Sequence, residues 1–485
     1  MKTKLKDNKI FRLIIIPICI ALCIFGKFIP LFPSLSQDAN GVIFIFISCL
    51  ILWLTIGIDW PSLLCIFAIA LLKTIGFKNA FINSFGNATF IFLLFTFICT
   101  YALSKTSLIR RIAINFINFP LAKKHGYLFV TFFLLAVLLL GLFMSPSVLF
   151  VVILPILKEI FAIAKIETGE KIAKVLMLSL GFTVSISSGM TLIAHVFPVL
   201  ALQALQNLSV VENVTPLQYM LFAIPVGLVT FGLMLFIFFV IIRPNGQKLV
   251  DADVSSLKAS LPKINAKDII TLVVFVVVLL LWVVPSLLEK AWPDFYKTIN
   301  GYTTAMPPLL GTLALLIIRV DGQPILKVDE AFKNVPWGSL LMCAATLLLG
   351  AALTNNDIGI KTFLNDNLSA SLQGIAPVIL IVIFLAWAAI QTNLSSNMVT
   401  ATLVSSVAVT VLSAVGEVNI PLLVSLIGLL ASFAFATPPS MPHIAIVAGD
   451  EYCSTKDVLI YGSILMVISI LVCVGCYYTI GSLVL

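Results

Sequence analysis

The sequence contains very little charge for its length. Of its 485 residues, 29 are Lys or Arg, 21 are Asp or Glu and 3 are His, so that charged residues make up only 10%. A soluble globular protein has about 25% charged residues, and this composition excludes that class. Hydrophobic residues reach 61% and form many runs near the ~20 residues that cross a bilayer as a helix. The chain is therefore predicted to be an all-α polytopic membrane protein.

Signatures of enzymes and of nucleic-acid binding are also missing. The sequence contains no GxxxxGK[ST], no HExxH and no pair of Asp residues within the apolar runs. The net charge of +8 comes from Lys and Arg in short loops, which indicates membrane topology rather than nucleic-acid binding. Cys473 and Cys476 form a CxxC without a second pair or a nearby His, which favours a buried helix face over a metal or redox site. We predict no enzyme activity, no cofactor and no nucleic-acid partner.

Basic residues near the ends of the apolar runs predict which side of the membrane each end faces. The N-terminal segment 1–41 contains a run that lacks a small-residue cleavage site, and we interpret it as an uncleaved first span with the N-terminus cytoplasmic. Ten further spans follow, and the C-terminus is expected outside. The eleven spans are predicted over residues 11–32, 42–58, 61–76, 86–103, 174–205, 219–242, 268–287, 304–319, 338–354, 420–448 and 458–482.

One apolar stretch, about 126–165, is predicted to enter and leave the membrane on the same side. Lys residues flank it at both ends, and it is interrupted at Ser145, Pro146 and Ser147. The apolar arm after the interruption, 148–157, has ten residues and would reach about half of the hydrocarbon thickness. We expect a re-entrant helical hairpin that enters from the cytoplasm. Two ordinary spans remain the alternative.

The second half of the chain repeats this order. A second hairpin is expected at about 373–414, entering from outside because its flanks hold one Lys and no Arg. A polar stretch at 243–267 carries both signs of charge and is predicted to be a cytoplasmic linker between two repeats, 42–242 and 268–485. Each repeat contains five crossings, so the second lies inverted relative to the first. Inverted repeats with broken helices indicate a secondary transporter with its site at the repeat interface.

Each predicted hairpin is followed, about 40 residues later, by another polar or proline-bearing interruption in an apolar run. A helix that breaks in hydrocarbon must have its freed backbone groups satisfied by protein, water or ligand. Helix N-termini that meet at mid-membrane favour anions, and hydroxyl and amide side chains add neutral donors. We therefore predict one anion-binding site. The candidate residues are Ser145, Pro146, Ser147, Gly189, His195, Ser396, Asn397, Met398, Thr437 and Pro438.

Structural alternatives exist for these residues. Pro146 with its two serines is also the pattern of a proline kink whose hydroxyls bond back to carbonyls. Asn397 is also suited to helix packing. A lone intramembrane His is commonly a hydrogen-bonded structural residue; His195, at the interrupted span, is the better site candidate, and His443 is the weaker one.

With these motifs the chain resembles the divalent anion/sodium symporter family of dicarboxylate, citrate and sulfate carriers, over nearly its whole length. That family has a Ser-Asn-Thr motif at each hairpin tip and a Ser/Thr-Pro-Pro-Asn turn in each broken helix. Here the second tip contains Ser396 and Asn397, and the second turn begins with Thr437 and Pro438. The resemblance implies a homodimeric elevator transporter, in which the hairpins and the spans after them move against a scaffold made of the other spans. It also implies that the tips hold the two carboxylates of a dicarboxylate.

Departures from the family pattern suggest which ion is coupled to transport. Pro146 stands where sodium-coupled relatives have Asn, Met398 stands where they have Thr, and His195 lies where the first Pro-Pro turn is missing. We therefore expect an exchanger that does not use sodium, similar to 2-oxoglutarate/malate translocators. If sodium binds, its expected ligands are Ser145, Asn397 and Thr437.

The resulting prediction is a secondary carrier of C4–C5 dicarboxylates such as malate, succinate, fumarate and 2-oxoglutarate, located in the plasma membrane. The alternative within this class is a sodium-coupled symporter of dicarboxylates, citrate or sulfate. An anion channel would use the same helix-tip chemistry. An intramembrane hydrolase with a Ser145 nucleophile is a remote alternative, because a proline follows that serine directly.

Overall fold

The computed structural model describes residues 9–485 except 33, 123, 207–213, 253–256, 259–260, 289–290, 361, 364–374 and 414–417. The described residues are almost entirely helical, and one short antiparallel pair, β1 (Arg319–Val320) with β2 (Gln323–Pro324), supplies their only strands. Seven of the described helices are long and apolar enough to cross a membrane, and a pair bent by 42° adds an eighth. The prediction of an all-α polytopic membrane protein is confirmed.

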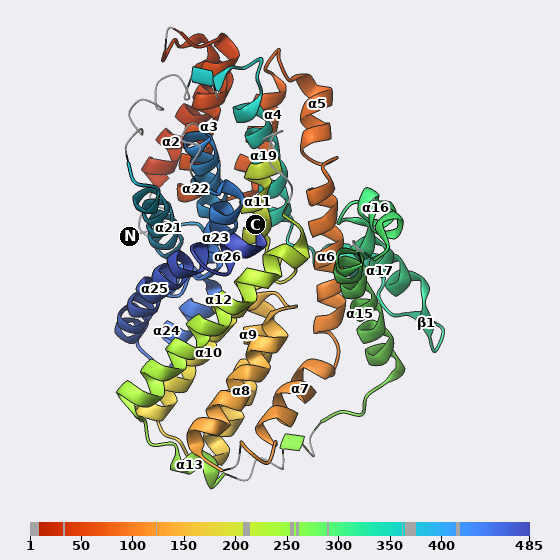
Figure 1. Cartoon of the computed structure of the whole chain (residues 1–485), viewed down its shortest axis with the longest axis vertical. Helices are drawn as coiled ribbons and strands as arrows, with labels where there is room; N and C mark the ends of the chain where they lie inside the picture. Colours follow the sequence, from red (N-terminus) through yellow and green to blue (C-terminus); the bar gives the residue numbers. More distant parts are fainter. Residues whose placement is uncertain are drawn as a thin grey trace.

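In the first part of the chain, α2–α5 lie at the top of Figure 1, and α6 and α7 continue downward from them. The bent pair consists of α5 and α6, and α7 follows it. The described elements are α2 (Lys9–Phe25), η1 (Gly26–Phe28), α3 (Gln37–Thr55), α4 (Asp59–Ala70), α5 (Gly76–Asn83), α6 (Ala88–Ser104) and α7 (Leu108–Ile117).

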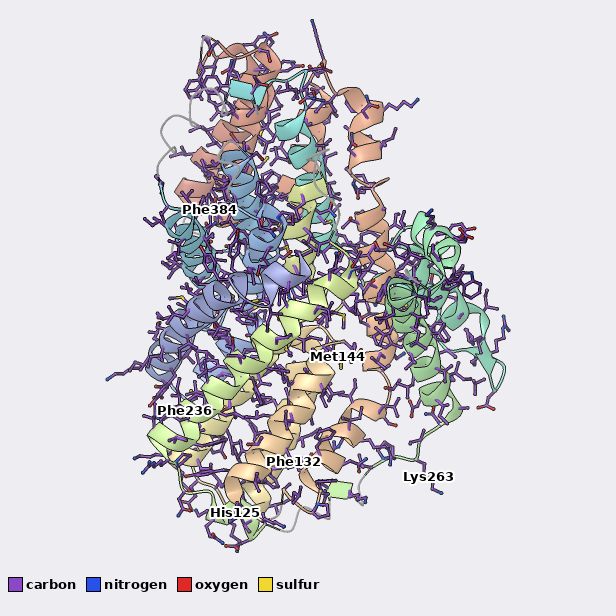
Figure 2. The ribbon with its side chains drawn as sticks, in the orientation of Figure 1. His125, Phe132, Met144, Phe236, Lys263 and Phe384 are labelled. Carbon is purple, nitrogen blue, oxygen red and sulfur yellow. The ribbon has the colours of Figure 1, made fainter. Side chains whose placement is uncertain are left out.

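Hairpin 1 consists of α8 (Gly126–Gly141) and α9 (Pro146–Ile163). Figure 2 shows its starting residue, His125, at the lower end of the molecule and Met144, next to its tip, near the middle. Pro146 is the first residue of α9, where its fixed φ suits a helix start and its missing N–H is not needed. The interruption is thus a turn between two helices and not a kink within one.

The span after hairpin 1 is broken, as the polar interruption predicted. It consists of α10 (Lys171–Gly189) and α11 (Val196–Gln206), and the next span is α12 (Pro216–Phe236) with the π-helical extension η2 (Ile237–Ile242). Of the 19 residues of α10, 17 are buried inside the protein. The one-turn helix α13 (Gln247–Val250), in the predicted linker, packs on α8.

Helices from the second half of the chain pack against helices from its first half. The long helix α15 and the shorter α17 pack against α6, and α19 packs against α3 and α4. The elements before hairpin 2 are α15 (Ala266–Leu287), α16 (Pro293–Gly301), α17 (Met306–Ile317), α18 (Val328–Lys333) and α19 (Trp337–Thr354).

Hairpin 2 consists of α21 (Pro377–Leu394) and α22 (Asn397–Leu412), with its tip at Ser395 and Ser396. The side chain of Ser396 accepts a hydrogen bond from the Val399 N–H and so caps α22. A second broken span follows, and the last span ends the chain. These elements are α23 (Ile420–Ser432), η3 (Pro438–Ser440), α24 (Pro442–Gly449), α25 (Thr455–Tyr477) and α26 (Gly481–Val484).

Ion pairs join the segments that were predicted to be cytoplasmic. Arg110 of α7 pairs with Glu159 of α9 at 2.9 Å, and Lys158 pairs with Asp450, after α24, at 2.8 Å. Lys174 of α10 pairs with Asp457 of α25 at 2.9 Å. These segments lie together toward the lower end in Figure 1. We call this the basic end of the molecule.

Candidate functional site

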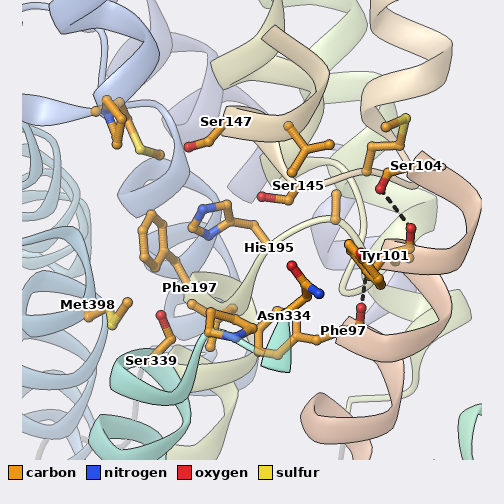
Figure 3. A pocket seen from close by; sticks show the side chains of 18 residues that line it. Phe97, Tyr101, Ser104, Ser145, Ser147, His195, Phe197, Asn334, Ser339 and Met398 are labelled. Carbon is orange, nitrogen blue, oxygen red and sulfur yellow. Dashed lines mark hydrogen bonds between the residues drawn. The ribbon is translucent and has the colours of Figure 1, made fainter. Parts of the chain in front are cut away.

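A cavity of about 420 Å³ lies where the two hairpin tips and the two broken spans meet α6 and the start of α19 (Figure 3). The hairpins and broken spans contribute Met144, Ser145, Ser147, Val148, Ala194, His195, Val196, Phe197, Met398, Met441 and Pro442. The opposite wall is made by Phe97, Thr100, Tyr101, Ser104, Asn334, Pro336 and Ser339.

Five helices begin at this cavity. Ser147 and Val148 are the second and third residues of α9, Val196 begins α11, and Met398 is the second residue of α22. The cavity also contacts Pro442, the first residue of α24, and Pro336, the N-cap of α19. The first N–H groups of a helix have no partner within it, and the helix dipole adds partial positive charge there. The arrangement therefore favours an anion.

The lining contains no Asp, Glu, Lys or Arg. Its polar side chains are hydroxyls, one amide and the His195 imidazole. Neutral donors and helix termini can hold an anion without an obligatory cation, which would be costly to leave unpaired in a membrane. The chemistry suits binding followed by release, and none of these residues forms a nucleophile–base pair by a measured hydrogen bond.

The structure places four of the ten predicted site residues on the cavity wall: Ser145, Ser147, His195 and Met398. Pro146 is buried at the start of α9, and the other five are not part of the lining. Those five are Gly189, Ser396, Asn397, Thr437 and Pro438. Figure 3 shows Ser145 and Ser147 on one side of His195 and Met398 on the other.

The tip of hairpin 2 is joined to the second broken span through Asn393. Its Nδ2 donates to the carbonyls of Ala389 at 2.8 Å and Phe433 at 3.3 Å, and its Oδ1 accepts from the Ala436 N–H at 2.6 Å. The Thr437 hydroxyl donates to the Asn393 carbonyl. Asn393 is 1% exposed, so this amide satisfies backbone groups that the helix break leaves without partners.

Asn397 and Thr392 add to the same junction. The Asn397 Nδ2 donates to the Ser440 carbonyl at 3.1 Å, and the Thr392 hydroxyl donates to the Ala431 carbonyl at 2.8 Å. The structure therefore shows Asn397 in a helix-to-turn contact. Asn393 was not among the predicted site residues, although it lies in the same polar run, QTNLSSN.

Hairpin 1 is joined to the first broken span at close range. The Thr191 hydroxyl donates to the Leu142 carbonyl at 2.6 Å. A Cβ on Gly141 would lie 1.9 Å from the Ser187 Oγ, so that only glycine allows α8 and α10 to approach this closely. The Tyr219 hydroxyl of α12 donates to the Gly189 carbonyl at 2.7 Å, which satisfies the end of α10 rather than presenting Gly189 to the cavity.

The two intramembrane histidines occupy different surroundings. His443 is fully buried, and its Nε2 lies 2.8 Å from the Ser185 Oγ, which joins α24 to α10. His195 lines the cavity, its ring is tilted against that of Phe197 with centroids 3.8 Å apart, and its buried Nδ1 has no hydrogen-bond partner. The buried Nδ1 of His443 has no hydrogen-bond partner either, so the two differ in position: His195 lines the cavity and can meet a ligand, whereas His443 connects two helices.

The wall made by α6 and the segment before α19 was not predicted. Tyr101 and Ser104 lie on α6, and Asn334 and Ser339 flank the start of α19. The sequence offered one signal: Asn334 and Pro336 follow one another closely before an apolar run, the pattern of a helix start.

The fold and the cavity define a polytopic helical membrane transporter. Residues 8–485 match the family model described as the sodium:sulfate symporter transmembrane region, and the chain belongs to that family. The predicted family is confirmed, and it is a family of transporters, not of enzymes.

Two relatives carry more specific names. A protein named sodium-dependent dicarboxylate transporter SdcS, from Staphylococcus saprophyticus, is 25% identical over 415 residues, which cover 81% of this chain and 76% of that protein. The protein of the same name from Staphylococcus aureus strain MRSA252 is 25% identical over 420 residues, which cover 83% of this chain and 78% of that protein.

These names contradict the expectation that sodium is not used. That expectation rested on Pro146 and Met398, which replace side chains of the family motif. A broken-helix site also coordinates sodium through unwound backbone carbonyls and half-helix ends, and a change of side chain leaves those oxygens in place. Side-chain identity at the tips was therefore an unsound guide to ion coupling.

Proposed function

We propose that this protein is a sodium-coupled symporter of a small dicarboxylate, located in the plasma membrane. The observation that carries the proposal is the convergence of five helix N-termini on a cavity whose lining has no charged side chain. The cavity volume of about 420 Å³ lies within the range of small-molecule sites. The names of the two relatives support both the dicarboxylate and the sodium.

In this proposal the hairpin tips hold the substrate. The hydroxyls of Ser145 and Ser147 and the N-terminus of α9 face one carboxylate, and the N-terminus of α22 with Met398 faces the other. His195 adds a donor between them. Two carboxylates match two opposed tips, whereas a monocarboxylate would leave one set of donors without a partner.

Sodium enters this proposal as the second transported species. Ser145, Asn397 and Thr437 remain its expected ligands, together with carbonyl oxygens of the unwound stretches 190–195 and 433–437. Oxygen ligands suit a hard cation. Its positive charge near the tips also offsets the charge of the dicarboxylate, which gives a physical reason for coupled transport.

The movement we propose is of the elevator type, in a homodimer. The hairpins, α10–α12 and α23–α26 would carry the site, and α2–α6 with α15–α19 would form the fixed scaffold. The cavity has one wall from each group, so relative movement of the groups would separate the substrate from the scaffold wall. The two inverted repeats, the cytoplasmic N-terminus and linker, and the C-terminus outside belong to the same proposal.

The test is uptake of labelled succinate by proteoliposomes under an inward sodium gradient, with no anion inside. Saturable uptake that is lost when choline replaces sodium supports symport. Uptake that needs an internal dicarboxylate and not sodium would establish exchange instead. Current without saturation would establish a channel.

A further inference from the structure

The scaffold wall of the cavity carries a charged cluster directly behind it. Tyr101 lines the cavity, and its hydroxyl donates to the Glu330 Oε1 at 3.1 Å. The Lys105 ammonium donates to the same carboxylate oxygen and lies 5.9 Å from the centroid of the Tyr101 ring. Asn334, also on the cavity wall, donates from Nδ2 to the Glu330 backbone carbonyl at 2.8 Å.

This cluster is open to water. The side chains of Lys105 and Glu330 are 46% and 33% exposed, although both contact residues of the cavity wall. A partly exposed ion pair is weak because water screens it. The Lys105 side chain is long and flexible, so its ammonium can change partners at little cost.

A dianion that enters an uncharged cavity loses much of its hydration before helix N-termini replace it. A cation near the cavity stabilises the anion during this loss of hydration, because it attracts the anion while both are still hydrated. Lys105 directly follows Ser104, a cavity-wall residue, at the end of α6. Its ammonium is therefore exposed to water and lies beside the cavity wall, where it contacts Glu330 and the ring of Tyr101.

We propose that Lys105 is the residue that captures and releases the anionic substrate on the side of the membrane where α6 ends, and that Glu330 is the partner to which it returns. This inference rests on the proposed dicarboxylate transport. The scaffold residue Lys105 would contact the substrate only when the cavity opens to the side where α6 ends, whereas the hairpin tips hold the substrate within the cavity.

Glu330 makes the capture reversible. The hydrogen bond from Lys105 lowers the pKa of the Glu330 carboxyl below its ordinary value, so the carboxylate is ionised at neutral pH. It competes with the substrate for the ammonium and repels the substrate's own carboxylates. Lys105 therefore binds the anion weakly, as release requires.

Lys105 attracts the anion and Glu330 opposes its binding, so substitutions of the two residues should change the KM for succinate in opposite directions. Lys105→Gln is expected to raise the KM for succinate about threefold at the face where α6 ends, as expected for the loss of one partly screened attraction. Glu330→Gln frees the ammonium and is expected to lower that KM severalfold. At the opposite face both variants should match the unaltered protein, because the scaffold cluster is then away from the substrate.

The experiment compares succinate uptake by intact cells with uptake by inside-out membrane vesicles, at saturating sodium and with expression measured for each variant. Lys327→Gln is the matched control, since Lys327 contributes charge near Glu330 from the N-cap of α18, whereas Lys105 pairs directly with Glu330 and lies 5.9 Å from the ring centroid of the cavity-wall residue Tyr101. Added choline chloride should raise the KM of the unaltered protein at the sensitive face only, and should have little effect on Lys105→Gln.

Equal KM values for Lys105→Gln and the unaltered protein at both faces would overturn the inference and leave the proposed function standing. So would a rise in KM with both Lys105→Gln and Glu330→Gln, which indicates a structural pair. If the unaltered protein takes up no dicarboxylate at either face, the proposed function fails, and the inference fails with it.

Discussion

At the scale of single residues, the molecule uses polar side chains inside the membrane in two ways. Some satisfy backbone groups where helices break, as Asn393 does for Phe433 and Ala436. Others keep hydrogen-bonding capacity toward the cavity, as His195 does. The two uses predict different consequences of substitution, because the first contributes to folding and the second to binding.

The histidines provide the clearest contrast. His195→Ala is expected to raise the KM for succinate about tenfold, the loss of roughly one hydrogen bond to the substrate, with little change in melting temperature. His443→Ala removes the partner of the buried Ser185 hydroxyl and should destabilise the fold by about 1–3 kcal/mol. Thermal unfolding in detergent, measured beside uptake, separates the two; an equal loss of stability in both variants would contradict the assignment.

Asn393 is the residue whose loss should be most damaging at the second tip. Asn393→Ala would leave the Ala436 N–H and the Phe433 carbonyl without this partner in a buried site, at about 1–3 kcal/mol for each group. We expect a lower melting temperature and little transport. Asn393→Asp loses the donor and places a carboxyl against the carbonyls of Ala389 and Phe433 in a buried site, so its melting temperature should be at least as low as that of Asn393→Ala. Unchanged stability of Asn393→Ala would show that this bridge is dispensable.

At the scale of elements, a helix contact at a glycine holds hairpin 1 against its broken span. Gly141→Ala would place a methyl group 1.9 Å from the Ser187 Oγ and is expected to push α8 from α10, with loss of stability and of transport. Gly232→Ala on α12 is the matched control, because a Cβ there meets no atom within 4 Å and alanine favours a helix. A melting temperature of Gly141→Ala that equals the control would mean that α8 and α10 adjust freely.

The elements were largely predictable because apolar runs and basic flanks report helices and their ends directly. Polar breaks marked both hairpins for the same reason. The second arm of hairpin 1 was expected over ten residues, but α9 has 18, because Lys158 and Glu159 near its end are satisfied by ion pairs. The helices α5 and α16 were not predicted, since short helices in loops lack a sustained apolar period.

The cavity was only half predictable from sequence. The hairpin-tip residues interrupt apolar runs, so they can be recognised from the sequence alone. Tyr101 and Asn334 occupy ordinary positions at a helix end and in a loop, and only the packing of α6 beside the start of α19 brings them to the cavity. The expectation that sodium is not used was wrong because it rested on two side-chain changes at the tips, and a broken helix also offers backbone oxygens to sodium.

At the scale of the whole molecule, the two groups of helices touch deep inside the protein. The Gln203 side chain of α11 donates to the Thr89 hydroxyl of α6, and both residues are at least 94% buried. In the proposed elevator movement this contact breaks and reforms. The double variant Thr89→Cys with Gln203→Cys, cross-linked by a bifunctional thiol reagent, is therefore expected to stop transport and to keep sodium-dependent succinate binding. Transport at full rate after complete cross-linking would rule out that movement.

In the proposed function, sodium and a dicarboxylate cross the membrane together. The most direct measurement follows radioactive sodium in proteoliposomes that have a succinate gradient and equal sodium on both sides. Symport predicts that inward succinate flow drives sodium into the vesicles above its outside concentration, and that the effect disappears without succinate. Succinate uptake with no net movement of sodium would rule out symport.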